Sequence, residues 1–168
     1  GIRPVHFRGV CTVVLKLLKI VTPTHLLLGQ KGFQQQLILR KMAAALNVPT
    51  VIVTCPTVRE ADGLAMSSRN RYLSPGDRQR AIGLWRGLSW ARQAYTAGER
   101  ASAELERGMI QEIEAHAMTL QYAVVADADT LEIFKGDVPG PSSGRNIIAL
   151  AATKIGNTPL IDHLLLAV

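Results

Sequence analysis

Two short polar loops carry the residue types that could do chemistry in this chain. The first, Gly29–Gln35, reads Gly-Gln-Lys-Gly-Phe-Gln-Gln and follows the apolar run His25–Leu28. An apolar run, a Gly/Lys loop and a helix together offer backbone N–H groups and one cation to a phosphate. Lys31 is therefore a candidate phosphate ligand, because its point charge can follow a departing pyrophosphate. The alternative, an ordinary solvated lysine in a turn, stays open.

The second loop, Asp62–Arg71, is rich in hydroxyl and guanidinium groups. Ser67, Ser68 and Arg69 offer two hydroxyls, one guanidinium and several backbone N–H groups. Such clustering suits a polyphosphate, although a loop that only caps the following helix is the alternative. If both loops serve one ligand, Lys31 and Ser67–Arg69 converge on a single triphosphate.

Other polar residues give weaker signals. Gln34, Gln35 and Gln36 open a helix, where they form either a solvated first turn or one amide aimed at a substrate's hydroxyl or carboxylate. His6 is either a ligand contact or a residue at a helix N-terminus, and the local sequence favours the latter. Structural or surface roles are expected for His25, His116, His163, Asp127, Asp129, Asp137, Trp85 and Trp90.

Composition narrows the class of protein. The chain has 168 residues, is 48% hydrophobic and carries a formal charge of +6, which favours anionic partners. Its arginines are scattered and only 5% of residues are aromatic, so a nucleic-acid-binding surface is not indicated. Cys11 and Cys55 lack metal-ligand spacing and are expected to be packed, reduced thiols. Lys16, Lys19 and Pro23 interrupt the most apolar stretch, so no membrane span is predicted.

The N-terminal part alternates between helix and strand. Apolar residues with a 3.6-residue period predict a helix over residues 5–21, which Pro23 ends. A short strand at His25–Leu28, a helix over residues 33–46 and a strand at Thr50–Cys55 follow. This alternation predicts parallel α/β packing, as in part of a Rossmann-like sheet.

A different pattern follows the long polar connection at residues 56–73. Ser74 and Pro75 form a helix-start signal, and helices are expected around Leu84–Tyr95 and Leu105–Ala117. The expected strands are Gln121–Ala126, Leu131–Phe134, Asn146–Thr153 and Leu160–Leu166. We therefore expect an α/β fold: a partial parallel sheet in residues 1–69 and a smaller α+β domain, with two helices and an antiparallel sheet, in residues 70–168.

Read in order, several strings resemble the pantothenate synthetase (pantoate–β-alanine ligase) family. The Asp-Gly-Leu-Ala-Met-Ser-Ser-Arg-Asn string is long and specific, and the likeness runs over essentially the whole chain. The matching segments are Arg3–Val10, Gly29–Gln35, Pro56–Ala65, Met66–Leu73 and Leu160–Asp162.

The resemblance implies a class I nucleotidyltransferase-like, two-step ligase. Pantoate attacks the α-phosphate of Mg-ATP, and β-alanine then displaces AMP from pantoyl adenylate. By carry-over, Lys31, Ser67, Ser68 and Arg69 hold the phosphates, and Gln35 binds pantoate. The nucleotide pocket is lined by Gly29, Gln30, Lys31, Gly32, Val58 and Met66, with His6 and Arg8 near the cleft. A cytoplasmic homodimer without nucleic-acid or membrane partners is implied.

The sequence also departs from the family pattern. The family's Gly-Glu-Lys-Asp is Gly29-Gln30-Lys31-Gly32 here, so two acidic residues are replaced, and Val5 replaces a glycine. The family places a paired-histidine motif and a second pantoate-binding glutamine before the segment that Gly1 begins, so a truncation is expected. Half a parallel sheet would leave a strand edge and apolar helix faces uncovered. We therefore expect residues 1–55 to be poorly stable alone and turnover to need the missing half.

Overall fold

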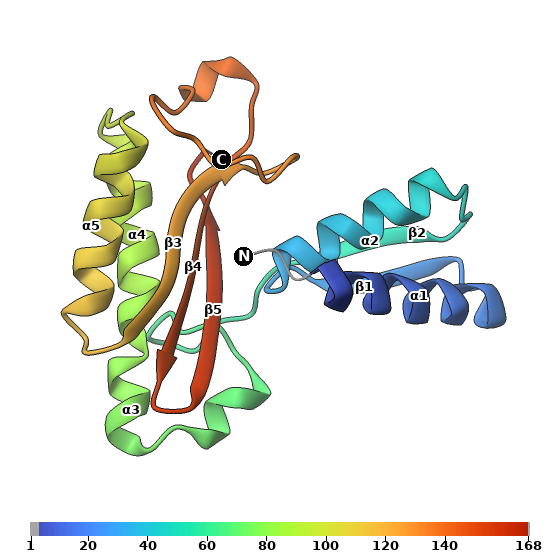
Figure 1. Cartoon of the computed structure of the whole chain (residues 1–168), viewed down its shortest axis with the longest axis horizontal. Coiled ribbons are helices and arrows are strands. Elements are labelled where there is room, and N and C mark those ends of the chain that lie inside the picture. The colour runs from blue at the N-terminus through green and yellow to red at the C-terminus, as the bar shows by residue number, and fades with distance from the viewer. Residues whose placement is uncertain (1–3, 168) are drawn as a thin grey trace. The chain divides into compact units, whose positions relative to one another are not determined.

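A computed structural model describes residues 4–167 (Figure 1). The chain divides into two compact units, Gly1–Thr57 and Val58–Val168, called unit 1 and unit 2 below. Gly1, Ile2 and Arg3, and with them the start of one matching string, lie outside the described residues. No helix in the described part of the chain is both long and apolar enough to cross a membrane.

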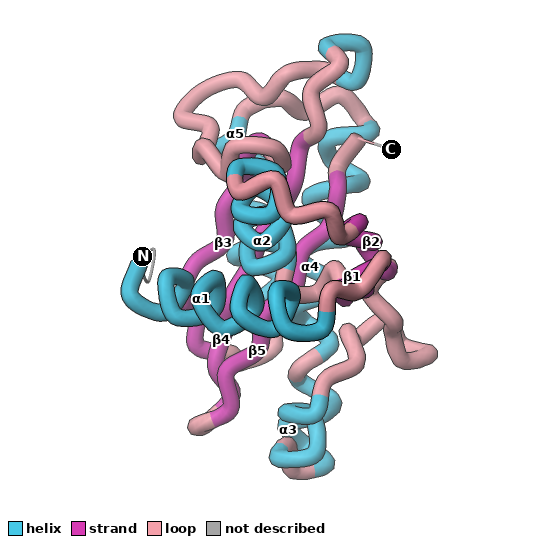
Figure 2. Tube along the Cα trace, turned by 90° about the vertical axis from the view of Figure 1, so that its right-hand side faces the viewer, coloured by secondary structure: helices cyan, strands magenta, loops and turns pink. Residues whose placement is uncertain are grey.

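Unit 1 contains the α/β alternation expected from the sequence. Its elements are α1 (Pro4–Val21), β1 (His25–Gly29), α2 (Phe33–Ala45) and β2 (Val51–Cys55). The two strands are parallel, with Leu26 opposite Ile52. Helix α1 packs on α2 (Figure 2). The four predicted elements and the parallel pairing are thereby confirmed.

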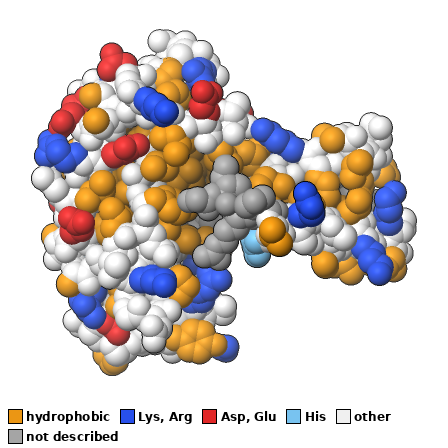
Figure 3. Space-filling model, in the orientation of Figure 1, with side chains coloured by type: hydrophobic (Ala, Val, Ile, Leu, Met, Phe, Trp, Pro, Cys, Tyr) orange, Lys and Arg blue, Asp and Glu red, His pale blue; other side chains and the backbone are white. Residues whose placement is uncertain are grey.

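Among the described residues of unit 1, a helix covers one face of the sheet and leaves the other exposed. Gln36 of α2 is buried and donates a hydrogen bond to the Thr54 hydroxyl of β2, so α2 lies on the Ile52 and Thr54 face. On the alternate face, the exposed fractions of Leu27 and Val51 are 65% and 54%. Exposed apolar side chains also mark α1 (Figure 3), as the sequence predicts for an incomplete sheet; they are Val5, Val13, Leu17, Ile20 and Val21.

Unit 2 is a helix layer on an antiparallel sheet. Strands β3 (Thr119–Asp127), β4 (Ile147–Ile155) and β5 (Thr158–Leu165) form a sheet in that order. The helices α4 (Ile82–Thr96) and α5 (Ser102–Glu114) pack against each other and against this sheet. Shorter elements are the 3₁₀ helices η1 (Ser68–Tyr72) and η2 (Pro141–Ser143) and the helix α3 (Pro75–Arg80).

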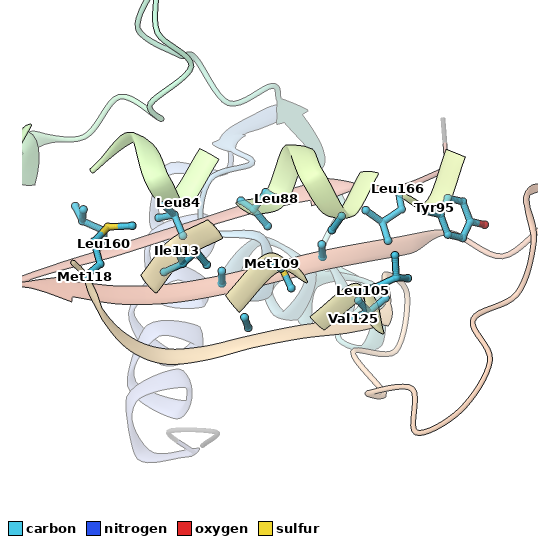
Figure 4. Packing of buried hydrophobic residues seen from close by; sticks show 14 of the residues in the cluster. Leu84, Leu88, Tyr95, Leu105, Met109, Ile113, Met118, Val125, Leu160 and Leu166 are labelled. Atoms are coloured by element: carbon cyan, nitrogen blue, oxygen red, sulfur yellow. The ribbon is translucent and has the colours of Figure 1, made fainter. Parts of the chain in front are cut away.

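The hydrophobic core of unit 2 lies between the two helices and the sheet (Figure 4). Leu88, Met109 and Ile147 are fully buried there. Glycine lets α4 and α5 approach closely: a Cβ on Gly87 would lie 2.8 Å from the Met109 carbonyl oxygen. Helix α3 begins as the sequence predicts, since the Ser74 hydroxyl accepts a hydrogen bond from the Asp77 amide and Pro75 follows.

The predicted fold class is confirmed, but the strand prediction for Leu131–Phe134 is wrong. In this segment only Ile133 forms an isolated bridge, to Ala126. The preceding turn is the reason, because the Asp127 carboxylate accepts hydrogen bonds from the Asp129 and Thr130 amides. Leu131 then adopts a left-handed conformation (φ 64°) that an extended strand does not permit.

The division between the units falls earlier than the domain boundary that the sequence suggests. We expected the first domain to end at residue 69, whereas Val58 already belongs to unit 2. Arg59 explains the difference, because its guanidinium forms an ion pair with Asp162 of β5. The assignment of residues 1–69 to one ATP- and pantoate-binding domain is a functional division and stays a prediction.

Candidate active site

The Gly29–Gln35 loop joins β1 to the start of α2. The loop begins next to the end of β2, because the Gln30 amide donates a hydrogen bond of 2.8 Å to the Cys55 carbonyl oxygen. Gly32 is the N-cap of α2 and supplies no side-chain cap. The first turn of α2 contains no acidic residue, so the positive end of the helix dipole is not neutralised by its own side chains.

The structure separates the roles of two adjacent glutamines. Gln36 is 3% exposed and its amide donates to Thr54, so it ties α2 to β2. Gln35 is exposed on the same helical turn. Of these two glutamines, Gln35 has the amide that is accessible to a ligand. Its role in binding pantoate stays a prediction.

His6 and Arg8 both lie on the first turns of α1 and are exposed. The His6 ring meets Phe7 edge-on, with 5.3 Å between the ring centroids. The carbonyl oxygen of Arg8 accepts a hydrogen bond from the Thr12 hydroxyl within the helix. Both are helix residues, as the local sequence favours, and their place near a cleft stays a prediction.

In unit 2, residues 58–66 fold back on themselves as a small hairpin. The Met66 amide donates to the Val58 carbonyl oxygen at 2.9 Å, and Arg59 and Ala65 form an antiparallel bridge. The Glu60 amide donates to the Leu64 carbonyl oxygen at 2.8 Å. The side chains of Val58 and Met66 are 66% and 50% exposed, so two predicted pocket residues sit together as accessible apolar groups.

Ser67, Ser68 and Arg69 follow this hairpin directly. Ser67 is the N-cap of η1, and its hydroxyl accepts a hydrogen bond from the Arg69 amide at 3.3 Å. Ser68 and Arg69 are exposed. Within the described part of the chain, the Arg69 guanidinium forms no ion pair. The loop therefore caps a helix and also presents an exposed cation. Its role in holding a polyphosphate stays a prediction.

Asn70 closes the turn that carries these residues. Its side-chain amide donates to the Ala65 carbonyl oxygen at 3.1 Å, and its side-chain oxygen is buried with no hydrogen-bond partner among residues 4–167. The Leu73 amide donates to the Asn70 carbonyl oxygen at 3.2 Å. The segment after the hairpin is thus held at both its ends.

A second ion pair secures the tip of the hairpin. Arg78 of α3 contacts both carboxylate oxygens of Asp62, at 2.7 and 3.0 Å. The hydrogen bond from Arg78 lowers the pKa of Asp62, against the opposing effect of burial. The Asp62 carboxylate also accepts from the Leu64 amide at 3.2 Å. Asp62 is therefore a structural residue of the loop, because its carboxylate forms the ion pair with Arg78.

Sequence reasoning missed the pairing of Arg59 with Asp162. Both residues lie in strings that carry the family resemblance, but the resemblance gives neither of them a role. One signal was available, since Asp162 interrupts the apolar strand prediction Leu160–Leu166, and a buried carboxylate requires a partner. That partner lies a hundred residues away along the chain, which no local pattern reveals.

Other features of the described residues lie away from these loops. No group of three or more His, Cys, Asp or Glu residues is placed to hold a metal ion in that part of the chain. A hollow of about 410 Å³ lies at the C-terminal ends of α1 and α2, and Leu18, Asn47 and Pro49 are among the residues that line it. It is at the opposite end of α2 from Gly29–Gln35.

Comparison with known proteins decides the family. A sequence model of the pantoate-beta-alanine ligase family matches residues 1–165. The chain belongs to this family. Its relatives include the pantothenate synthetase of Moorella thermoacetica, which is 47% identical over 99% of this chain and 57% of the relative. That of Pelotomaculum thermopropionicum is 46% identical over 98% of this chain and 56% of the relative.

Solved structures of the family agree with the fold. The pantothenate synthetase of Thermus thermophilus superposes with a TM-score of 0.89 at 36% identity, over 99% of this chain and 58% of the other. The ligase of Francisella tularensis, in complex with beta-gamma ATP and beta-alanine, gives 0.68 at 30% identity over 98% and 52%. The chain thus spans little more than half the length of these pantoate–β-alanine ligases.

Proposed function

We propose that this chain carries part of the active site of an ATP-dependent ligase that joins pantoate and β-alanine. The observation that carries the proposal is the Ser67–Arg69 segment, which is fixed at both ends and presents an exposed guanidinium. Family membership supplies the substrate class, because the Francisella tularensis relative binds beta-gamma ATP and beta-alanine.

In the first proposed step, a carboxylate oxygen of pantoate attacks the α-phosphorus of ATP. The bond from this phosphorus to the bridging oxygen breaks, and pyrophosphate leaves with the electron pair. Lys31, Ser67, Ser68 and Arg69 hold the phosphates and neutralise the charge that grows on pyrophosphate. The backbone of Gly29, Gln30 and Gly32 and the side chains of Val58 and Met66 line the nucleotide site.

In the second proposed step, the amine of β-alanine attacks the acyl carbon of pantoyl adenylate. The acyl–oxygen bond breaks, AMP leaves, and the amine loses its proton to solvent as the amide of pantothenate forms. Gln35 holds pantoate through both steps, with His6 and Arg8 beside the cleft. In-line alignment is the main requirement of this chemistry.

Magnesium enters this proposal as part of the substrate, Mg-ATP. Gly29–Gln35 offers no carboxylate, because Gln30 and Gly32 stand where the family has acidic residues. The ion would therefore be held by phosphate oxygens and water, as is usual for magnesium at nucleotide sites. The resemblance extends the proposal to a cytoplasmic location and to a homodimer, and sedimentation analysis of the purified protein would test the homodimer.

Exchange of radioactive pyrophosphate into ATP tests the first step. We expect exchange that depends on pantoate, with the purified chain or after addition of the part of the Moorella thermoacetica enzyme that this chain does not match. Lys31→Met should abolish it, and Lys41→Met, which removes an exposed lysine of α2, should leave it unchanged. No exchange in either arrangement would refute the ligase function for this polypeptide.

A second candidate is a non-catalytic protein that keeps unit 2 as a folded module. The loss of both acidic residues at Gln30 and Gly32 favours it. The two candidates differ in binding as well as turnover: the ligase binds Mg-ATP through Arg69, and the module does not. Titration calorimetry with Mg-ATP therefore distinguishes them.

A further inference from the structure

The guanidinium of Arg59 contacts three separate parts of unit 2. It contacts both oxygens of the Asp162 carboxylate, at 2.6 and 3.1 Å. It also donates to the carbonyl oxygens of Gly63, at 3.1 Å, and His163, at 3.3 Å. Its plane lies over the Trp85 ring, 4.0 Å from the ring centroid. One side chain thus joins the hairpin, α4 and β5.

Asp162 is built to receive this guanidinium. Its side chain is 2% exposed, and its carboxylate accepts a further hydrogen bond from the His163 amide at 2.8 Å. A buried carboxylate is strongly destabilising without a cation, so Asp162 fixes where Arg59 must lie. The Arg59 side chain is itself only 19% exposed and both its terminal nitrogens are already hydrogen-bonded, so we assign it no phosphate.

The Trp85 ring fixes the other side of the hairpin. Gly63 has a φ of 94°, a conformation that favours glycine, and a Cβ at this position would overlap the Trp85 ring. The same ring therefore meets the hairpin tip through Gly63 and the hairpin limb through Arg59. Because Arg59 is bridged to Ala65, the limb that leads to Ser67 is held with it.

We propose that Arg59 is a positioning residue for the Ser67–Arg69 segment. Through Asp162 and Trp85 it clamps the hairpin Val58–Met66 onto α4 and β5, so that Ser68 and Arg69 are presented to the phosphates in one fixed arrangement. The proposal rests on the proposed ATP-binding role of that segment. In this proposal Arg59 stabilises the fold of the hairpin, and Arg69 binds the phosphates.

Arg59→Lys in the full-length chain tests the clamp. Lysine keeps the charge but cannot reproduce the paired contacts to Asp162 together with stacking on Trp85. We expect hydrogen exchange at the Glu60, Gly63 and Met66 amides to become about tenfold faster, together with tryptic cleavage after Arg69. Mg-ATP affinity should fall by about tenfold, since the segment must then be ordered on binding.

Arg145→Lys is the matched control. Arg145 also forms a two-contact ion pair with a buried aspartate, Asp127, at 2.7 and 3.0 Å, and its guanidinium lies over the Phe134 ring. The control loses the same kinds of contact elsewhere in unit 2. It should lower thermal stability to a similar extent and leave exchange and cleavage in residues 60–71, and Mg-ATP affinity, unchanged.

The outcomes separate this proposal from the function on which it rests. Equal exchange and cleavage in Arg59→Lys and Arg145→Lys would overturn the positioning role, because Arg59 would then act only as a core ion pair. Faster exchange with unchanged Mg-ATP affinity would overturn it too. If the wild-type chain binds no Mg-ATP, the proposed function fails, and so does the claim that Arg59 positions the segment for phosphates. The hydrogen-exchange data would still decide whether Arg59 holds the hairpin in place.

Discussion

Arg69 and Arg71 lie two residues apart on η1 and differ in what surrounds them. Arg71 donates to the Tyr72 hydroxyl at 2.7 Å and lies over that ring, whereas Arg69 is exposed and follows Ser67 and Ser68 in the chain. Only Arg69 is therefore placed for an anion in our proposal. The two residues carry the same charge, so they make a sharp comparison.

We predict that Arg69→Ala lowers Mg-ATP affinity by about tenfold to a hundredfold, the value of a hydrogen bond to a charged group. Arg71→Ala should change affinity by less than about threefold, since it removes the same charge without removing a phosphate contact. Titration calorimetry of both variants at one salt concentration measures the difference. Equal losses would show that only general charge attraction is involved.

The carboxylate of Asp127 gives stability a pH dependence at the residue scale. Burial alone would raise its pKa, but hydrogen bonds from Arg145 and from the Thr130 and Asp129 amides outweigh burial and lower it. A lowered pKa in the folded state means that the unfolded state binds the proton more readily. This contribution to stability is therefore complete above the unfolded value, about pH 4, and is lost as pH falls through the folded value.

We predict that Asp127→Asn weakens the pH dependence of the free energy of unfolding in this acid range. The variant should also be less stable at pH 7, because Arg145 loses its partner. Urea titrations between about pH 3 and pH 6 measure both effects. A slope unchanged by Asp127→Asn would contradict the prediction.

At the scale of elements, hydrophobic periodicity predicted α1, β1, α2 and β2, and the three antiparallel strands. These elements are specified by their own apolar residues, so local sequence suffices for them. The segment Leu131–Phe134 has the composition of a strand. The turn that Asp127 stabilises lies before it, and the segment forms a single isolated bridge to β3. The anchoring of the 58–66 hairpin depended on Asp162, and tertiary pairs of this kind leave no local pattern.

Glycines at the contact between α4 and α5 carry the next prediction. A Cβ on Gly108 of α5 would overlap the Trp90 ring of α4. We predict that Gly108→Ala lowers the free energy of unfolding by about 1–3 kcal/mol, because the half-buried ring packs against the core and must shift to make room. Gly76→Ala in α3, where nothing lies within 4 Å, should be neutral or stabilising by up to about 1 kcal/mol. Urea unfolding of the two variants measures both values.

The two units differ in how completely they bury their apolar residues. The buried core cluster runs from Leu64 to Leu166 and lies wholly within unit 2. Unit 1 has a two-stranded sheet with exposed Leu27 and Val51 and an exposed apolar stripe on α1. A two-stranded sheet with one bare face is marginal in water. Stability in this chain is therefore concentrated in unit 2.

We predict that residues 58–168 unfold cooperatively as an isolated fragment, whereas residues 1–57 alone give no cooperative transition. A third fragment, residues 73–168, keeps the helices and the sheet but lacks Arg59. It should be less stable than 58–168 by as much as about 3–5 kcal/mol, because the Asp162 carboxylate loses its cation. Asp162→Asn in the shorter fragment should restore part of this loss. Thermal and urea unfolding of the fragments measure their order of stability. Equal stability of 58–168 and 73–168 would show that the hairpin does not stabilise the core.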